Sequence, residues 1–220
     1  MNILIEGWRG LNHSYCLVNQ WQILELVKST NIFFKDTPFI SENWNTTKNS
    51  DGFKNKTKEI INKIPCINSN QPVDITYRIS SPCNFDKNFH SKLLVIFATC
   101  EYKYLDKINY KNGNPNDVNQ NDKILLHTPS LWSKEGLINS GLKDNKILII
   151  PHGVNKDYFN GVSFKEREIL RNKKMIDKES IILTNVGAMT ENKGIEMLIS
   201  VYGILKKKYK NLKLILKDQS

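Results

Sequence analysis

The sequence lacks the signatures of several protein classes. Its four cysteines, Cys16, Cys66, Cys83 and Cys100, are far apart and form no C-x-x-C pair, which argues against a zinc knuckle and against a secreted disulfide framework. No apolar run is long enough to span a bilayer, and Glu6 follows the first residue too soon for a signal peptide. The dinucleotide fingerprint G-x-G-x-x-G is absent, so nothing indicates nicotinamide or flavin. We therefore expect a cytoplasmic protein.

The charge is strongly basic but does not select one partner. The 220 residues carry 32 lysines and arginines against 22 acids, a net charge of +10. This excess permits binding to phosphates, to nucleic acid or to the anionic inner face of a membrane, where a peripheral contact is possible. Arginine clusters with interleaved aromatic residues are missing, so we expect no specific nucleic acid partner. The hydrophobic share of 40% is typical of a globular protein.

Short apolar strands alternate with helices over the first part of the chain. A helix is expected over 15–28, and a second one begins after Ser130 as N-cap and stops at Gly141. The segment 41–70 is polar with a weak helical pattern, and 107–121 is rich in Asn, Gly, Lys and Asp and is expected to be a loop. The expected strands are 2–6, 31–34, 73–79, 93–97, 123–127 and 146–150. This alternation predicts an α/β fold with a doubly wound parallel sheet.

The last third of the chain predicts the start of a second α/β domain. We place the first domain at 1–158, a charged linker with a basic helix at 159–179, and an incomplete second domain at 180–220. The second domain begins with a strand over 180–186, continues with a helix whose apolar residues lie on one face, and ends with a strand over 212–216. Two strands and one helix cannot close a core, so another chain completes this domain or the sequence is a fragment.

The turn between the strand 180–186 and the following helix is a candidate anion site. It is bracketed by Gly187 and Gly194, and it carries Lys193. Such a turn directs free backbone N–H groups and the positive end of the helix dipole toward a ligand above the strand. A phosphate-bearing ligand is the natural candidate. The same features also fit an ordinary βα turn with a solvated lysine.

Further candidates follow the strands of the first domain. Arg9 and His13 come after the first strand, and Glu101 comes after the strand 93–97, so parallel strands would place all three at one edge of the sheet. His13 contacts a ligand in a cleft or caps the next helix. Arg9 contacts a ligand or stacks on Trp8. Glu101 contacts a ligand or caps the next helix.

Three segments together resemble the retaining glycosyltransferases of family 4. Ile149-Ile150-Pro151-His152-Gly153-Val154-Asn155 with Phe159 is similar to the family's "PxGVD…F" segment. The second segment, Val186-Gly187 followed by Asn192-Lys193-Gly194-Ile195 and Leu198-Ile199, resembles its "VG…KG…LI" segment. The third, Thr128-Pro129-Ser130 with Lys134, resembles its "PSxxxK" helix start. Their order and separation agree with the family, and the resemblance covers the whole chain, more loosely before Asp122.

The resemblance implies two Rossmann-like domains of the GT-B type that face each other across a cleft. The second domain would hold a nucleotide-sugar donor, with Lys193, Gly187 and Gly194 at its diphosphate. The first would receive a glycan, lipid or small-molecule acceptor. No cofactor or metal is implied, since the nucleotide sugar is a co-substrate and no D-x-D pair is present. The remaining implied site residues are His13 and Glu101 as catalytic candidates, Arg9, Gly10 and Asn12 at the cleft, and Pro151, His152 and Gly153 at the interdomain hinge.

Two departures from the family pattern affect this interpretation. Ala188 stands where many members have an arginine, and the E-x7-E segment that contacts the donor sugar would lie beyond Ser220. We therefore expect a hexosyl-type transferase whose present chain is inactive alone. The alternative is a non-catalytic nucleotide- or polyanion-binding α/β module, a truncated remnant.

Overall fold

The computed structural model describes residues 1–11, 13–38, 55–68, 71–157, 159–187 and 189–218. The chain divides into two units, Met1–Gly153 and Val154–Ser220, and each is described by itself. The expected candidates Asn12 and Ala188 lie outside the described residues, as do residues 41–54 and 69–70 of the polar stretch 41–70.

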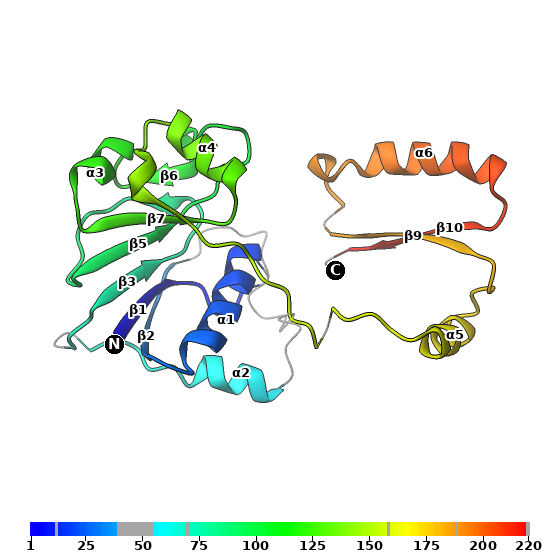
Figure 1. The fold of residues 1–220 in the computed structure, drawn as a ribbon, viewed down its shortest axis with the longest axis horizontal. Coiled ribbons are helices and arrows are strands. Elements are labelled where there is room, and N and C mark those ends of the chain that lie inside the picture. Colours follow the sequence, from blue (N-terminus) through cyan, green and yellow to red (C-terminus); the bar gives the residue numbers. More distant parts are fainter. Residues whose placement is uncertain (12, 39–54, 69–70, 158, 188, 219–220) are drawn as a thin grey trace. The chain divides into compact units, whose positions relative to one another are not determined.

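The first unit is built on a six-stranded parallel sheet, which confirms the predicted α/β fold (Figure 1). Its strand order is β2-β1-β3-β5-β7-β8, and every neighbouring pair is parallel. The strands are β1 (Asn2–Gly7), β2 (Asn31–Asp36), β3 (Ile75–Arg78), β5 (Leu93–Phe97), β7 (Ile124–Thr128) and β8 (Ile147–Ile149). The sequence predicted all six within a few residues.

Helices cover both faces of this sheet. Helices α1 (Ser14–Leu26) and α2 (Asn55–Asn62) lie on one side, and α3 (Pro115–Gln120) and α4 (Leu131–Asn139) lie on the other (Figure 1). Along β5, Leu94 and Ile96 pack in a cluster with Leu137 of α4, whereas Phe97 packs in a second cluster with Ile23 of α1. Both faces of β5 are therefore buried, which explains why its sequence is apolar without polar alternation.

The segment 107–121 was wrongly predicted to be a loop. It contains the 3₁₀ helix η1 (Lys107–Asn109), the short strand β6 (Tyr110–Lys111) and α3. β6 pairs in parallel with β4 (Cys83–Asn84), a second small sheet that the sequence did not indicate. Asn114 caps α3 in a capping box with Asp117, and Pro115 occupies the first turn. These Asn and Pro residues start a helix rather than a loop, because side-chain capping and a fixed φ suit its first turn.

Helix α4 follows the predicted caps. The Ser130 hydroxyl accepts a hydrogen bond from the Ser133 backbone N–H at 3.1 Å, and Gly141 has a φ of +94° directly after the last turn. A residue with a side chain is disfavoured at such a positive φ, so glycine ends the helix at low cost. The next element is the 3₁₀ helix η2 (Asp144–Lys146), which leads into β8.

The second unit contains few elements and buries little. It comprises α5 (Phe164–Lys173), β9 (Ile181–Val186), the 3₁₀ helix η3 (Glu191–Lys193), α6 (Ile195–Lys208) and β10 (Leu212–Lys217). β9 and β10 are parallel, with Ile181 opposite Leu212. Among the described residues of this unit only Ser180 and Leu212 are buried, as expected for so small a set of elements.

Within the part of the chain that the structure describes, the helices do not reach the length and apolar character that a membrane crossing requires.

Candidate functional site

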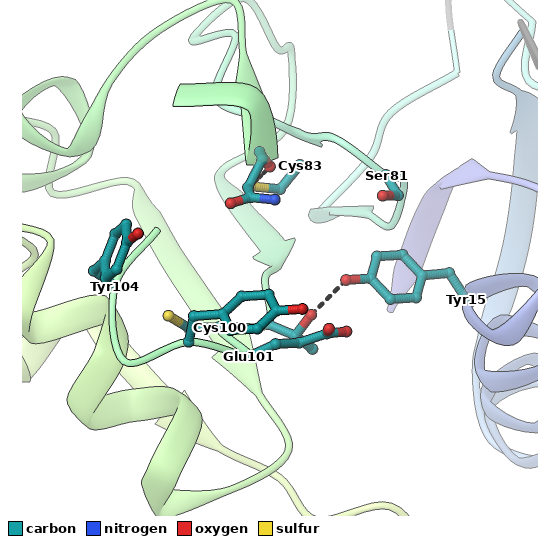
Figure 2. A pocket seen from close by; sticks show the side chains of 9 residues that line it. Tyr15, Ser81, Cys83, Cys100, Glu101 and Tyr104 are labelled. Carbon is teal, nitrogen blue, oxygen red and sulfur yellow. Dashed lines mark hydrogen bonds between the residues drawn. The ribbon is translucent and has the colours of Figure 1, made fainter. Parts of the chain in front are cut away.

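The carboxyl ends of β3 and β5 open into a polar pocket in the first unit (Figure 2). Its volume of about 130 Å³ would hold roughly four water molecules at ~30 Å³ each. The lining side chains come from the loops after the two strands, from β4, from α1 and from η1: Tyr15, Ser81, Cys83, Thr99, Cys100, Glu101, Tyr102, Tyr104 and Asn109. A pocket at this edge is where open parallel sheets bind ligands.

Tyr15, Thr99 and Glu101 form the polar side of this pocket. The Tyr15 hydroxyl lies 2.5 Å from Thr99 Oγ1, a contact between the first turn of α1 and the loop after β5. Burial raises the pKa of the Tyr15 hydroxyl, and the negative charge of Glu101 raises it further. The pocket therefore presents a protonated phenol and a carboxylate, which can donate to and accept from one polar ligand.

Cys83 and Cys100 belong to the pocket wall and are not nucleophiles there. Burial raises the pKa of the Cys83 thiol to about 12, and its Sγ donates to the Asn109 carbonyl at 3.0 Å. Burial also raises the pKa of Cys100. Since the thiolate is the reactive form, neither residue has the character of a catalytic cysteine.

His13 has the capping role that the sequence left open. It is the N-cap of α1, and its Nδ1 accepts a hydrogen bond from the Tyr15 backbone N–H at 3.1 Å. Its ring contacts Trp8 and Tyr15 edge-on, with centroid distances of 5.1 and 5.4 Å. Burial lowers the pKa of His13, so the neutral imidazole is favoured and its ring proton sits on Nε2. His13 is not among the described residues that line the pocket, but its ring contacts Tyr15, which does line it.

Aromatic rings connect this region to the predicted hinge. Phe97 is fully buried and packs edge-on against Tyr15 at 5.1 Å and stacks on His152 at 5.9 Å. His127 Nε2 donates to the Ile150 carbonyl at 3.1 Å, so its Nδ1 accepts from the Tyr77 hydroxyl at 3.0 Å. Pro151, His152 and Gly153 are exposed at the end of the first unit. These contacts of Ile150 and His152 with the sheet therefore fix the course of the chain close to Gly153, where the first unit ends.

Arg9 lies at the same sheet edge, but its guanidinium is bound by other groups of the protein. It forms a salt bridge to Asp36 at 2.9 Å and donates to the Ile64 carbonyl at 2.9 Å. Its charge lies 4.6 Å from the centre of the Phe34 ring, not over Trp8 as the sequence suggested. These contacts join the loop after β1 to β2 and to the end of α2. Gly10, its exposed neighbour, has open space where a side chain would begin.

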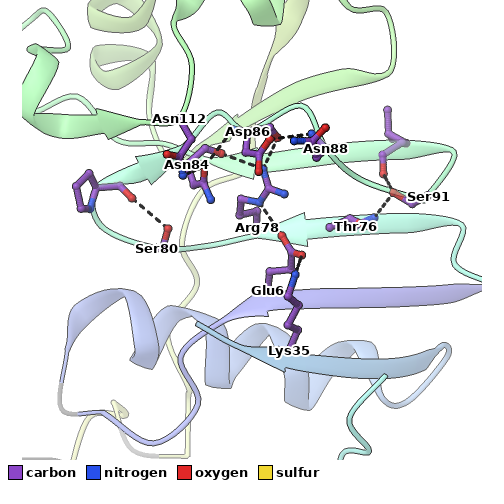
Figure 3. A network of polar contacts seen from close by, with 12 residues as sticks. Glu6, Lys35, Thr76, Arg78, Ser80, Asn84, Asp86, Asn88, Ser91 and Asn112 are labelled. Atoms are coloured by element: carbon purple, nitrogen blue, oxygen red, sulfur yellow. Dashed lines mark hydrogen bonds and ion pairs between the residues drawn. The ribbon is translucent and has the colours of Figure 1, made fainter. Parts of the chain in front are cut away.

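A buried ion pair supports one wall of the pocket (Figure 3). Arg78 Nε donates to Glu6 Oε2 at 2.7 Å, and Arg78 Nη1 donates to the carbonyls of Asn84 and Asp86 at 3.2 and 2.6 Å. Although burial alone would raise the pKa of Glu6, the charges of Arg78 and Lys35 hold it below its usual value. Arg78 therefore fixes the segment after Ser81 and Cys83, two residues of the pocket lining.

The second unit contains the predicted glycine turn. Gly187 has a φ of +155°, and Gly194 has a φ of +66° at the N-cap of α6. Among the described residues no side chain caps α6, and the first helical hydrogen bond of this turn runs from the Leu198 N–H to the Gly194 carbonyl. The N–H groups of its first turn are therefore available to an anion. Lys193 is exposed on the preceding 3₁₀ turn, and Glu191 and Glu196 flank it.

Sequence reasoning found one side of the pocket and missed the other. Glu101 was recognised because it follows an apolar strand, and the same rule applied to every strand would have found Ser81 and Thr99. Tyr15 and Asn109 come from a helix and a 3₁₀ turn, so only the three-dimensional structure brings them to the pocket.

Within the described ranges no group of three His, Cys, Asp or Glu side chains could hold a metal ion.

Comparisons with known proteins find similarity to proteins named as glycosyltransferases and to their fold. No family model matches the sequence. Over 158 residues the chain is 27% identical to the uncharacterized glycosyltransferase MJ1059 of Methanocaldococcus jannaschii, and this match spans 71% of the chain and 34% of that relative. The chain therefore covers about a third of the length of this curated relative.

Solved structures match over the full chain. The structure of Anabaena Alr3699/HepE in complex with UDP-glucose aligns with 100% of this chain and 61% of its own, with a TM-score of 0.62 and 14% identity. The glycosyltransferase from Rickettsia africae ESF-5 aligns with 99% of this chain and 68% of its own, with a TM-score of 0.59 and 12% identity. At sequence identities this low, the similarity to these structures shows a shared fold and no more. The chain has the α/β fold of these structures, consistent with the GT-B type.

Proposed function

We propose that this protein transfers a hexosyl unit from a nucleoside diphosphate sugar to an acceptor, with retention of configuration. The observation that carries the proposal is the uncapped start of α6 behind a turn with Gly187 and Gly194 at positive φ and Lys193 exposed beside it. The similarity to a named glycosyltransferase, and a fold that HepE presents with UDP-glucose bound, support it.

In this proposal the glycine turn binds the donor diphosphate. When the glycosidic bond breaks, negative charge grows on the leaving nucleoside diphosphate. Helix N–H groups and the Lys193 ammonium would stabilise that charge more in the transition state than in the ground state, which is the condition for catalysis. The side chains present suit this task without a metal ion.

The pocket of the first unit is proposed to receive the acceptor. Glu101 would accept a hydrogen bond from an acceptor hydroxyl and orient it for attack. His13, neutral at physiological pH because burial lowers its pKa, is proposed as a second catalytic residue beside the pocket, next to Tyr15. Pro151, His152 and Gly153 are the proposed hinge. The acceptor is a glycan, a lipid or a small molecule, and a peripheral contact with an anionic membrane is compatible with the basic composition.

Calorimetric titration separates this proposal from a polyanion-binding module. UDP-glucose, UDP and heparin would each be titrated at low and at physiological salt. We expect UDP-glucose and UDP to bind with a weak dependence on salt. Binding of heparin alone, with affinity that falls steeply as salt rises, would replace the proposal with the basic-surface alternative. The anomeric configuration of any product, read by proton NMR, tests retention.

A further inference from the structure

Three exposed aromatic side chains, here called the aromatic rim, lie in the lining of the polar pocket or next to it. Tyr102, Tyr104 and Trp132 are exposed to 72%, 58% and 50%. The two tyrosines line the pocket, and the Trp132 Nε1–H donates to the Glu101 carbonyl at 3.3 Å. Aromatic side chains at this place offer flat apolar faces on which a ligand ring can stack.

Helix α4, which carries Trp132, holds the loop that carries Tyr102 and Tyr104. The Ser133 hydroxyl accepts from the Cys100 backbone N–H at 2.8 Å, and the Asn139 side chain donates to the Lys103 carbonyl at 3.1 Å. Lys103 has a φ of +63°, a left-handed conformation that is uncommon for a residue with a side chain, and it lies between Tyr102 and Tyr104. Its ammonium lies 4.8 Å from the centre of the Trp132 ring. The loop is therefore preorganised.

The pocket favours a neutral ligand with several hydroxyl groups. It presents the hydroxyls of Tyr15, Ser81 and Thr99, the Asn109 side chain and the Glu101 carboxylate, and the described residues that line it include no lysine or arginine. A phosphate would meet the Glu101 carboxylate without a compensating cation in the lining. A sugar ring, by contrast, has hydroxyl groups for the polar side and an apolar C–H face for an aromatic ring.

We propose that the pocket and its aromatic rim bind a sugar ring, with Glu101 and the hydroxyl groups on its edge and Tyr104 on its face. Together with the proposed function, on which this step rests, the inference makes the acceptor a glycan or glycoside. The cavity of about 130 Å³ matches one ring edge rather than a whole chain of sugars, so further sugars would extend along the exposed rim toward Trp132.

Two-dimensional NMR of the whole chain tests the proposal. Methyl α-D-glucopyranoside, methyl α-D-mannopyranoside and maltose would be titrated, with uridine as the competing aromatic ligand, and the Trp132 indole N–H signal reports on the rim. We expect Tyr104→Ala and Glu101→Gln each to weaken glycoside binding about tenfold, the size of one lost stacking or charged hydrogen-bond contact. Tyr104→Phe should retain binding, because it keeps the ring.

The controls separate this inference from the proposed function. Tyr209→Ala removes an exposed tyrosine of the second unit and should leave glycoside binding unchanged. The inference is overturned if no glycoside shifts the pocket signals at tens of millimolar, if uridine alone does so, or if Tyr104→Ala and Glu101→Gln bind as the wild type does. UDP-glucose binding that persists in such a case would leave the proposed function standing, whereas glycoside binding without any nucleotide-sugar binding would refute only the function.

Discussion

Replacing Arg78 by methionine should strongly destabilise the first unit. The Arg78 side chain is 5% exposed and the Glu6 side chain 14%, so the substitution leaves a largely buried carboxylate with Lys35 as its remaining ion-pair partner. It also removes the donor to the carbonyls of Asn84 and Asp86. Removing one partner of a buried pair costs about 3–5 kcal/mol, mostly because the other charge stays buried. We expect a loss in that range.

The assay is urea unfolding followed by tryptophan fluorescence. All four tryptophans lie within residues 1–153, so the signal reports on the first unit. Lys35→Met is the matched control: it removes the other cation of Glu6, but at a side chain 63% exposed, and should cost less than about 1 kcal/mol. In Glu6→Gln/Arg78→Met the loss should be smaller than the sum of the single losses. Equal unfolding midpoints for Arg78→Met and Lys35→Met would refute this reasoning.

Two further predictions concern the pocket and its surroundings. In Gly136→Ala the new Cβ would clash with Cys100 Sγ and lie 3.1 Å from the Lys103 carbonyl carbon, so we expect a loss of about 1–3 kcal/mol in urea unfolding together with weaker glycoside binding. An unchanged midpoint would show that α4 does not position the loop. Burial lowers the pKa values of His13, His127 and His152 from 6.5, so below pH 6.5 the unfolded chain binds protons that the folded chain does not. The free energy of unfolding should therefore fall as pH drops from 6.5 toward these lowered values, and a flat profile between pH 7 and 5 would contradict the lowered pKa values of these histidines.

The parallel sheet could be predicted from sequence because each of its strands is an apolar run between turn signals. Leu93–Phe97 is buried on both faces, so its composition alone identifies it. The segment 107–121 was harder to interpret because Asn114 and Pro115 occur both in loops and at helix starts, and only the reciprocal contacts of a capping box decide between them.

The candidate site was predictable only in part. Glu101 follows its strand directly, so a topological rule locates it. Arg9 met the same rule, yet in the structure its charge is taken by Asp36 and the Ile64 carbonyl, partners 27 and 55 residues away in sequence. Pairing over such distances is decided by packing, which sequence spacing does not encode. The same reason explains why Tyr15 was expected as a helix residue and not as a pocket residue.

The affinity for UDP-glucose in the presence and absence of the Lys193 ammonium tests the central claim most directly. Calorimetry would compare the wild type with Lys193→Ala and with Lys165→Ala, an exposed lysine of α5 that serves as the matched control. One charge-assisted hydrogen bond to a diphosphate is worth about 1.5–3 kcal/mol, which corresponds to roughly 10- to 150-fold in affinity. We predict a loss of that size in Lys193→Ala and none in Lys165→Ala. Equal affinities in all three proteins would contradict the assignment of the glycine turn to the donor diphosphate.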